Sequence, residues 1–226
     1  MTCYENIPTE LKKLNQWVCT RGNSKVPMKA WENEAASSTN PQTWADFDTA
    51  HKSVSDGHYD YCGFVFNDNG FVGVDIDMGY DEDGLLSPLA ADIIGKCRSY
   101  TEKSKSGRGF HILLKGDLPF KGKNNLAGVE IYKSSRYFIM TGDTLLFRSI
   151  EENQSAIEYI VEKYFKKFNV AQTSYLECLL GRVCQWVFLM QKYKKEPRQN
   201  NCSGSLLGGP DRIRTDDTRF RRAVLY

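Results

Sequence analysis

Apolar residues recur along this chain at two spacings, one typical of β-strands and one typical of α-helices. Short apolar or alternating runs predict strands at 16–19, 61–66, 71–76, 110–115, 129–132 and 137–141. Apolar residues three and four positions apart predict helices over 9–14, 40–54, 87–97 and 149–168. Strand runs with helices inserted between them predict an α+β fold of mainly antiparallel sheets with flanking helices.

Turn and capping residues give the predicted boundaries of these elements. Asn69-Gly70 lies between two strand runs, and this pair favours the positive backbone angles of a tight hairpin. Asn40-Pro41 and Ser87-Pro88 are typical helix starts, with a capping residue before a proline in the first turn. Ser149 and the glutamate three positions later match a capping box. The polar stretch 99–106 is predicted to be a loop.

The length of 226 residues and the hydrophobic fraction of 41% allow one ordinary domain with a segment appended. We predict a main domain over residues 1–168, a helical remnant over 169–195 and a disordered tail over 196–226. No run approaches the roughly 18 apolar residues of a membrane span, and the start lacks a signal-peptide pattern. Seven scattered cysteines without a Cys-x-x-Cys pair indicate neither a zinc site nor a disulfide framework. A cytoplasmic protein without a membrane partner is expected.

The last part of the sequence differs in composition from the rest. Residues 196–226 contain six Arg and no Lys, whereas residues 1–195 contain 18 Lys and six Arg. Weak apolar periodicity and several glycines are typical of a disordered segment. Residues 208–215 resemble the translation of a transfer-RNA gene read on its opposite strand, and a basic interaction tail is the alternative.

Charge is separated along the chain although the net charge is only +2. Residues 75–95 hold six acidic side chains and no Lys or Arg, whereas residues 96–136 hold ten basic and three acidic side chains. An acidic site beside a basic track suits metal ions next to a polyanion.

Asp75 and Asp77 flank Ile76 at the end of a strand run, so their carboxylates are expected on one face of the sheet. Hard cations such as Mg²⁺ or Mn²⁺ prefer oxygen ligands, and two such ions can activate a hydroxyl and stabilise a leaving pyrophosphate. Taken alone, Asp-x-Asp is more often a solvated strand end.

A second signature joins small residues, hydroxyls and cations just before a strand run. It includes Ser104, Ser106 and Arg108, and ends at His111. Backbone amides near glycines, hydroxyls and basic side chains can together bind a triphosphate. His111 can hydrogen-bond a phosphate, and a flexible glycine turn with a packed histidine is the alternative.

A third acidic residue, Glu130, lies between apolar neighbours that are expected to face the core. It is a candidate third metal ligand, with an ordinary strand-face carboxylate as the alternative. Arg136, predicted in the turn before the last strand run, is a candidate for phosphate recognition through its planar guanidinium group.

Together these stretches resemble the primase-polymerase domain of the archaeo-eukaryotic primase superfamily, in the version found in phage and plasmid replication proteins. The resemblance covers residues 5–168 and includes Gln16-Trp17-Val18, Lys25-Val26-Pro27, the 39–44 run and the segment from Arg136 to Gly142. It implies a modified RNA-recognition-like sheet with helices and template-directed synthesis of primers or DNA. The expected setting is a phage or integrated mobile element in a bacterial or archaeal cell.

The resemblance also assigns roles to the candidate residues. Asp75, Asp77 and Glu130 match the metal-binding acids, His111 matches the nucleotide-binding histidine, and Ser104, Ser106, Arg108 and Arg136 are expected to contact the nucleotide. The implied cofactor is Mg²⁺ or Mn²⁺, and the implied partners are nucleoside triphosphates, a DNA template and a separate helicase.

Two other functions remain open at this stage. Such proteins usually continue into a helical module, which is expected here only as a remnant, so a non-catalytic nucleic-acid-binding fragment is one alternative. A metal-dependent nuclease or phosphohydrolase is the other, because the same carboxylates can activate water.

Overall fold

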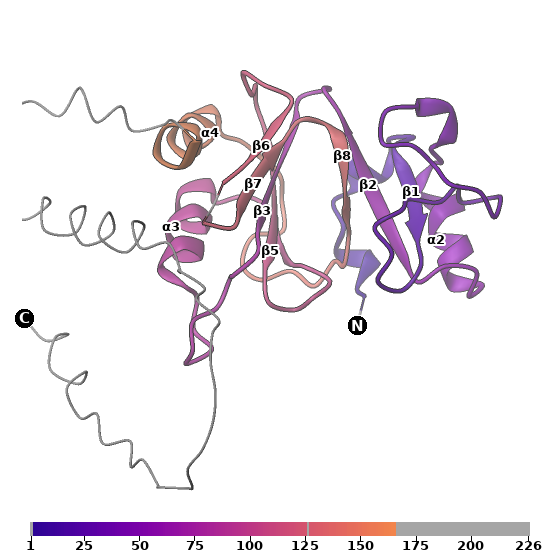
Figure 1. Ribbon diagram of the computed structural model, residues 1–226, viewed down its shortest axis with the longest axis horizontal. Coiled ribbons are helices and arrows are strands. Elements are labelled where there is room, and N and C mark those ends of the chain that lie inside the picture. Colours follow the sequence, from indigo (N-terminus) through magenta and orange to yellow (C-terminus); the bar gives the residue numbers. More distant parts are fainter. Residues whose placement is uncertain (1, 126, 166–226) are drawn as a thin grey trace, which may run out of the picture. The chain divides into compact units, whose positions relative to one another are not determined.

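Two β-sheets lie next to each other between helices in the computed structural model of this chain (Figure 1). The structure describes residues 2–125 and 127–165. The helices are α1 (Thr9–Lys12), α2 (Phe47–Ser55), α3 (Pro88–Cys97) and α4 (Gln154–Ile160), with short turns η1 (Tyr4–Asn6), η2 (Pro41–Thr43) and the π-helical η3 (Val161–Phe165). The predicted α+β class with mainly antiparallel sheets is confirmed.

The larger sheet has the strand order β4-β5-β3-β7-β6, and all of these neighbours are antiparallel. Its strands are β3 (Phe71–Ile76), β4 (Thr101–Lys103), β5 (Phe110–Lys115), β6 (Gly122–Asn124) and β7 (Val129–Tyr132). The short strand β9 (Glu151–Glu152) pairs in parallel with the end of β5. The central position of β3 places its side chains between two neighbouring strands.

Helices α3 and α4 cover one face of the larger sheet. Apolar side chains from alternate strand positions, such as Val74, Ile112 and Ile131, form a buried cluster with Ile93 of α3 and Ile157 of α4. Alternation along a strand sends the residues between them to the opposite face. That opposite face carries the polar residues described below.

The smaller sheet has the antiparallel order β1-β2-β8, formed by β1 (Trp17–Thr20), β2 (Tyr61–Asn67) and β8 (Ser134–Ile139). Its core is aromatic: Trp17 is fully buried and packs edge-on against Phe47 of α2 and Phe64 of β2. Phe66 and Phe138 extend the same cluster towards Leu113 in the larger sheet. The two sheets therefore share a core where β2 and β8 approach β3 and β5.

The predicted hairpin between residues 61–66 and 71–76 is wrong. β2 pairs with β1 and β8, whereas β3 pairs with β5 and β7, so the two runs belong to different sheets. Asp68 and Gly70 both adopt positive φ angles, and the Asp68 amide donates to the Lys133 carbonyl. The turn residues were recognised, but tertiary pairing decides which strands become neighbours.

The single helix predicted from Asn40 to residue 54 is also interrupted. Asn40 caps only the short turn η2, and Trp44 is extended because Ala45 exchanges backbone hydrogen bonds with Trp17. Asp46 then caps α2 through a hydrogen bond from the Thr49 amide. A second capping residue inside the periodic stretch starts the helix again.

Near the end of the described chain, the predicted capping box is replaced by strand β9. Glu151 and Glu152 pair with β5, and the helix begins at Gln154 with Asn153 as its cap. The helical remnant over 169–195 and the tail over 196–226 lie outside the described residues, and the boundary at 168 stays a prediction. None of the helices within residues 2–125 and 127–165 is long and apolar enough to cross a membrane.

Candidate active site

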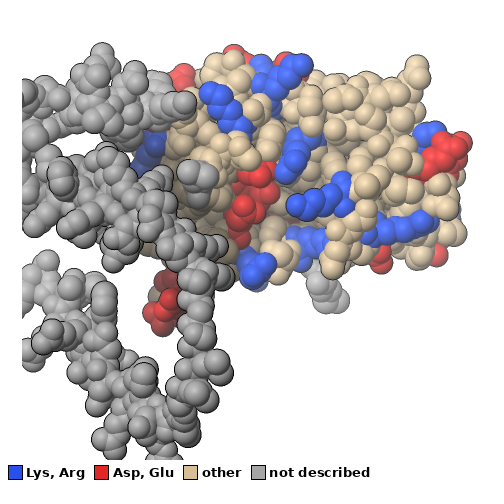
Figure 2. All heavy atoms as spheres, viewed as in Figure 1, with Lys and Arg blue, Asp and Glu red and all other residues tan. Residues whose placement is uncertain are grey.

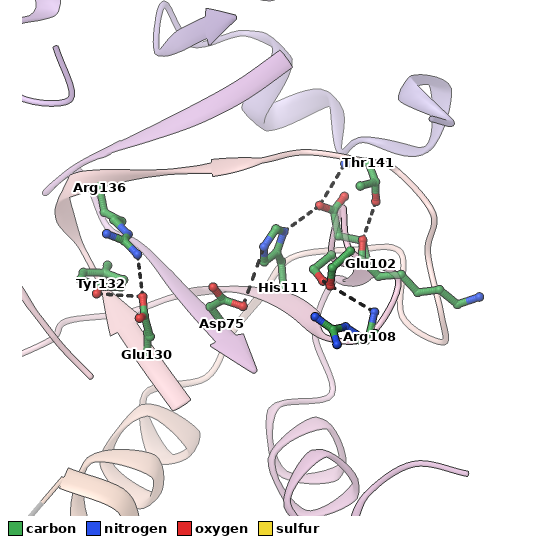
Figure 3. A network of polar contacts seen from close by, with 11 residues as sticks. Asp75, Glu102, Arg108, His111, Glu130, Tyr132, Arg136 and Thr141 are labelled. Atoms are coloured by element: carbon green, nitrogen blue, oxygen red, sulfur yellow. Dashed lines mark hydrogen bonds and ion pairs between the residues drawn. The ribbon is translucent and has the colours of Figure 1, made fainter. Parts of the chain in front are cut away.

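A row of polar residues crosses four neighbouring strands of the larger sheet. Glu102 of β4 is opposite His111 of β5, His111 is opposite Asp75 of β3, and Asp75 is opposite Glu130 of β7. Directly opposite residues in a sheet send their side chains to the same face. The four side chains therefore meet on the face away from α3 and α4 (Figure 3).

His111 lies between two carboxylates in this row. Its Nδ1 is 3.2 Å from Glu102 Oε1 and its Nε2 is 3.9 Å from Asp75 Oδ1. The Phe138 ring of β8 stacks on the imidazole with ring centroids 4.6 Å apart. The imidazole is consequently buried, with only its Asp75 side directed towards the open part of the site.

Glu130 forms the other end of the row with residues from β7 and β8. Its Oε2 accepts hydrogen bonds from Arg136 Nη2 at 2.8 Å and from the Tyr132 hydroxyl at 2.9 Å. The Arg136 guanidinium also lies over the Tyr132 ring, 5.0 Å from its centroid. Arg136 was predicted in a turn, but it belongs to β8 and pairs with Phe66.

The serine loop (residues 104–109) borders Asp77, which directly follows β3. Gly109 has no room for a side chain, because a Cβ atom there would overlap the Ile76 carbonyl oxygen. The Ser104 and Ser106 hydroxyls lie 3.1 Å apart and face the same cavity as Asp77. The glycine thus allows the hydroxyl-bearing loop to approach the carboxylate-bearing strand.

The row opens into a cavity of about 540 Å³. Seven of the eight residues predicted for the site line it: Asp75, Asp77, Ser104, Ser106, His111, Glu130 and Arg136. Arg108 is exposed and is not among the lining residues. Figure 2 shows a group of acidic side chains on this view of the molecule with Lys and Arg side chains beside it, as the charge pattern predicts.

One part of the cavity wall was not predicted from the sequence. The segment Asn23–Lys25 lies across from the serine loop, and the Lys105 ammonium group reaches it by hydrogen bonding to Gly22 O and Asn23 Oδ1. The Tyr137 hydroxyl donates to the Lys25 carbonyl at 2.9 Å. Only the Lys25-Val26-Pro27 motif gave a signal for this wall.

Glu102 was also missed, because the stretch 99–106 was predicted to be a polar loop. Residues 101–103 form β4 instead, and the Glu102 side chain is fully buried beside His111. A three-residue strand without apolar alternation gives no periodic signal.

The electrostatic balance of the site favours a bound cation. Burial raises the pKa of the Asp75 carboxyl, and the charges of Asp77 and Glu130 add to this, whereas His111 and Arg136 oppose it. Burial lowers the pKa of His111, but the hydrogen bond with Glu102 and the charge of Asp75 outweigh it, so the net shift is upward. Burial and the hydrogen bond to Glu130 raise the pKa of Tyr132 to about 12.

Three carboxylates around one cavity are the oxygen donors that Mg²⁺ or Mn²⁺ prefers, so Asp75, Asp77 and Glu130 fit such an ion by their chemistry. Within residues 2–125 and 127–165, however, no three Asp, Glu, His or Cys side chains are already grouped as a metal site. Glu130 is occupied by Arg136 and Tyr132. A metal ion would therefore require these side chains to exchange partners.

Comparison with known proteins agrees with the motifs that the site brings together. No protein-family model matches the chain. The chain is similar to a DNA primase-polymerase. This relative comes from Nitratiruptor phage NrS-1 and is 32% identical over 142 residues, which are 59% of this chain and 20% of the relative.

The predicted resemblance to primase-polymerases is confirmed by this relative. The chain spans about a fifth of the relative's length, so the similarity concerns one part of a larger protein.

Proposed function

We propose that this chain carries the active site of a DNA primase-polymerase, which transfers nucleotides in a template-directed, metal-dependent reaction. The observation that supports this most is the register of β5, β3 and β7, which brings His111, Asp75 and Glu130 together at one cavity. Acidic metal ligands next to phosphate-binding groups are what nucleotidyl transfer requires. The similarity to a phage DNA primase-polymerase supports the same reaction.

Asp75, Asp77 and Glu130 would hold Mg²⁺ or Mn²⁺ in this proposal. The bound ions would supply charge stabilisation for the reacting phosphate and activation of the attacking hydroxyl. Asp75 is the central ligand, because its carboxylate lies in the middle strand between His111 and Glu130. Asp77 would complete the set from the chain segment that follows β3.

The triphosphate would lie between the serine loop and Arg136. Ser104 and Ser106 offer hydroxyl donors, His111 directs Nε2 towards the cavity, and Arg136 offers a planar guanidinium group. Arg108, which is exposed and does not line the cavity, would contact the phosphates only with its side chain in another orientation. Charge-assisted hydrogen bonds of this type orient phosphates strongly.

The proposed partners are nucleoside triphosphates, a DNA template and a separate helicase. The proposed setting is the replication of a phage or integrated mobile element.

The decisive experiment combines the purified chain with single-stranded DNA, nucleoside triphosphates and Mn²⁺. We expect oligonucleotide synthesis or extension that is lost in Asp75→Ala and Asp77→Ala while both variants keep their circular dichroism spectra. Asp83→Ala is the matched control, because Asp83 is exposed and does not line the cavity.

Undiminished synthesis in both site variants would contradict the assignment. Release of nucleotides from DNA without added triphosphates would indicate a metal-dependent hydrolase. Binding of single-stranded DNA without metal-dependent nucleotide binding would indicate a non-catalytic fragment.

A further inference from the structure

We propose that Glu102 is a positioning residue for His111. Its carboxylate binds Nδ1 of the imidazole and so keeps Nε2 directed towards the bound triphosphate. This inference rests on the proposed function and adds a residue to it. Glu102 itself does not line the cavity, so it would act only through His111.

The Glu102 carboxylate is fully buried and has four hydrogen-bonding contacts. Oε1 accepts from the Thr141 amide at 3.1 Å and lies 3.2 Å from His111 Nδ1. Oε2 accepts from the Gly142 amide at 2.8 Å and from the Tyr100 hydroxyl at 2.7 Å. A buried carboxylate with this many partners has a single defined orientation.

The nature of these partners determines which imidazole nitrogen carries a hydrogen. Two backbone amides and one hydroxyl all donate to Glu102, so its carboxyl oxygens act as acceptors in these three bonds. The remaining contact, with His111 Nδ1, then requires a hydrogen on Nδ1. Nε2 then lies on the side of Asp75 and the cavity, where it can donate to a phosphate oxygen when it also carries a hydrogen.

Two further features restrict the imidazole to this orientation. Phe138 stacks on the ring at an interplanar angle of 19°. Gly142 adopts a φ of +66°, and a Cβ atom there would overlap the Cys3 carbonyl oxygen. The glycine therefore lets two successive amides, those of Thr141 and Gly142, reach one carboxylate. The segment that follows β8 thus fixes Glu102, and Glu102 fixes His111.

This arrangement gives a role to motif residues that the proposed function leaves without one. Phe138, Thr141 and Gly142 all belong to the segment that resembles primase-polymerases, yet none is expected to touch the reacting atoms. In the structure they surround His111 and its carboxylate partner. Outer partners that orient a histidine commonly change ligand affinity when they are removed.

The first test is nuclear magnetic resonance of the imidazole nitrogens in the complete chain. In the unsubstituted protein we expect a slowly exchanging hydrogen on Nδ1 of His111, assigned by its loss in His111→Ala. In Glu102→Gln we expect this signal to broaden or shift. A hydrogen on Nε2 alone in the unsubstituted protein would overturn the proposal, and this result does not depend on whether the variant folds.

The second test is a double-substitution cycle on nucleotide affinity, measured by calorimetry with a non-hydrolysable nucleoside triphosphate and Mn²⁺. We expect Glu102→Gln to weaken binding about tenfold, at the lower end of the effect of such orienting partners. In the His111→Ala background the same substitution should cause no further loss, because its effect passes through His111. Equal losses in both backgrounds would show a general structural role and overturn the proposal.

Asp92→Asn is the matched control for converting a hydrogen-bonded acid to its amide. Asp92 lies on α3 and bonds to Tyr159 and Lys163, away from the cavity, so nucleotide affinity should not change. Absence of nucleotide binding by the unsubstituted chain would contradict the proposed function instead. In that case the nitrogen spectrum still decides whether Glu102 positions His111.

Discussion

Arg136 Nη2 lies 2.8 Å from Glu130 Oε2, so the proposed phosphate-binding cation and the proposed metal-binding carboxylate are paired with each other. Each neutralises the other in the cavity wall, and Tyr132 bonds to the same carboxylate oxygen. When a metal ion and a triphosphate bind together, Glu130 would pair with the metal ion and Arg136 with the triphosphate in place of their ion pair. The pair therefore predicts that metal and nucleotide bind cooperatively.

Replacing Arg136 should lower the affinity for nucleotide much more than it lowers the stability of the fold. The Arg136 side chain is 47% exposed, and ion pairs of this kind contribute about 0–1 kcal/mol to folding. Loss of one charge-assisted hydrogen bond to phosphate costs about 1.5 kcal/mol or more, which is roughly tenfold in affinity. We expect Arg136→Gln to show this loss by calorimetry at a nearly unchanged melting temperature. Arg148→Gln, at an exposed position that does not line the cavity, should bind nucleotide normally.

Removing the charge of Asp75 should abolish metal binding without lowering the stability of the metal-free protein. Burial and the nearby charges of Asp77 and Glu130 disfavour its ionised form, so Asp75→Asn should not lower the melting temperature in the absence of metal. The unsubstituted protein should gain about 2.7 kcal/mol when Mn²⁺ is 100-fold above its dissociation constant.

Thermal unfolding with and without Mn²⁺ measures this gain, which Asp75→Asn should lose. Asp48→Asn on the exposed side of α2 should retain it. A full Mn²⁺ response in Asp75→Asn would argue against Asp75 as a ligand.

Two glycines of the serine loop should respond differently to alanine. At Gly109 a Cβ atom would overlap the Ile76 carbonyl oxygen and lie 3.1 Å from that of Asp77, so β3 and the loop must separate. We expect Gly109→Ala to cost about 1–3 kcal/mol and to abolish synthesis, because Asp77 is displaced. Gly107 has open space around it and a φ of +71°, so Gly107→Ala should cost only about 1–2 kcal/mol of backbone strain. Chemical denaturation and primer extension measure both effects.

The stability contributed by the contact between Asp92 of α3 and the end of the described chain should depend on pH. Burial raises the pKa of Asp92, but hydrogen bonds from Tyr164, Lys163 and Tyr159 outweigh it, so the net shift is downward. A carboxyl whose pKa is lower in the folded state adds stability above its unfolded pKa of about 3.9 and loses it as pH falls through the folded value.

We therefore expect Asp92→Asn to cost about 1–3 kcal/mol near neutral pH and progressively less below about pH 4. Denaturation curves at several pH values measure the difference between the two proteins. A constant difference down to pH 2 would contradict this contribution, and Asp83→Asn in an exposed loop should show none.

Three of the strands that carry the site, β3, β5 and β7, were predictable from the sequence because they are mostly apolar runs of four to six residues. The runs ending at Ile76, Lys115 and Tyr132 were all placed correctly. Alternation in the 129–132 run also predicted that Glu130 points away from the core, and in the structure Glu130 is opposite Asp75.

The features that escaped prediction depend on contacts between distant segments. Glu102 lies in a strand of three residues that exists because β5 is beside it. The hairpin predicted around Asn69-Gly70 does not form, because β2 pairs with β8 and β3 pairs with β5. Local turn chemistry favours a reversal of the chain, but it does not select the partner strand.

The row from Glu102 to Glu130 makes the site sensitive to strand register. One residue inserted within β3, β5 or β7 would move every following side chain of that strand to the opposite face, so polar site residues would point towards the helices. Apart from the loop at 104–109, the segments that join these strands meet no such restriction, so the spacing between the motifs along the chain can vary. Distant relatives of this protein should therefore be recognised strand by strand, with variable gaps, rather than by fixed spacings between motifs.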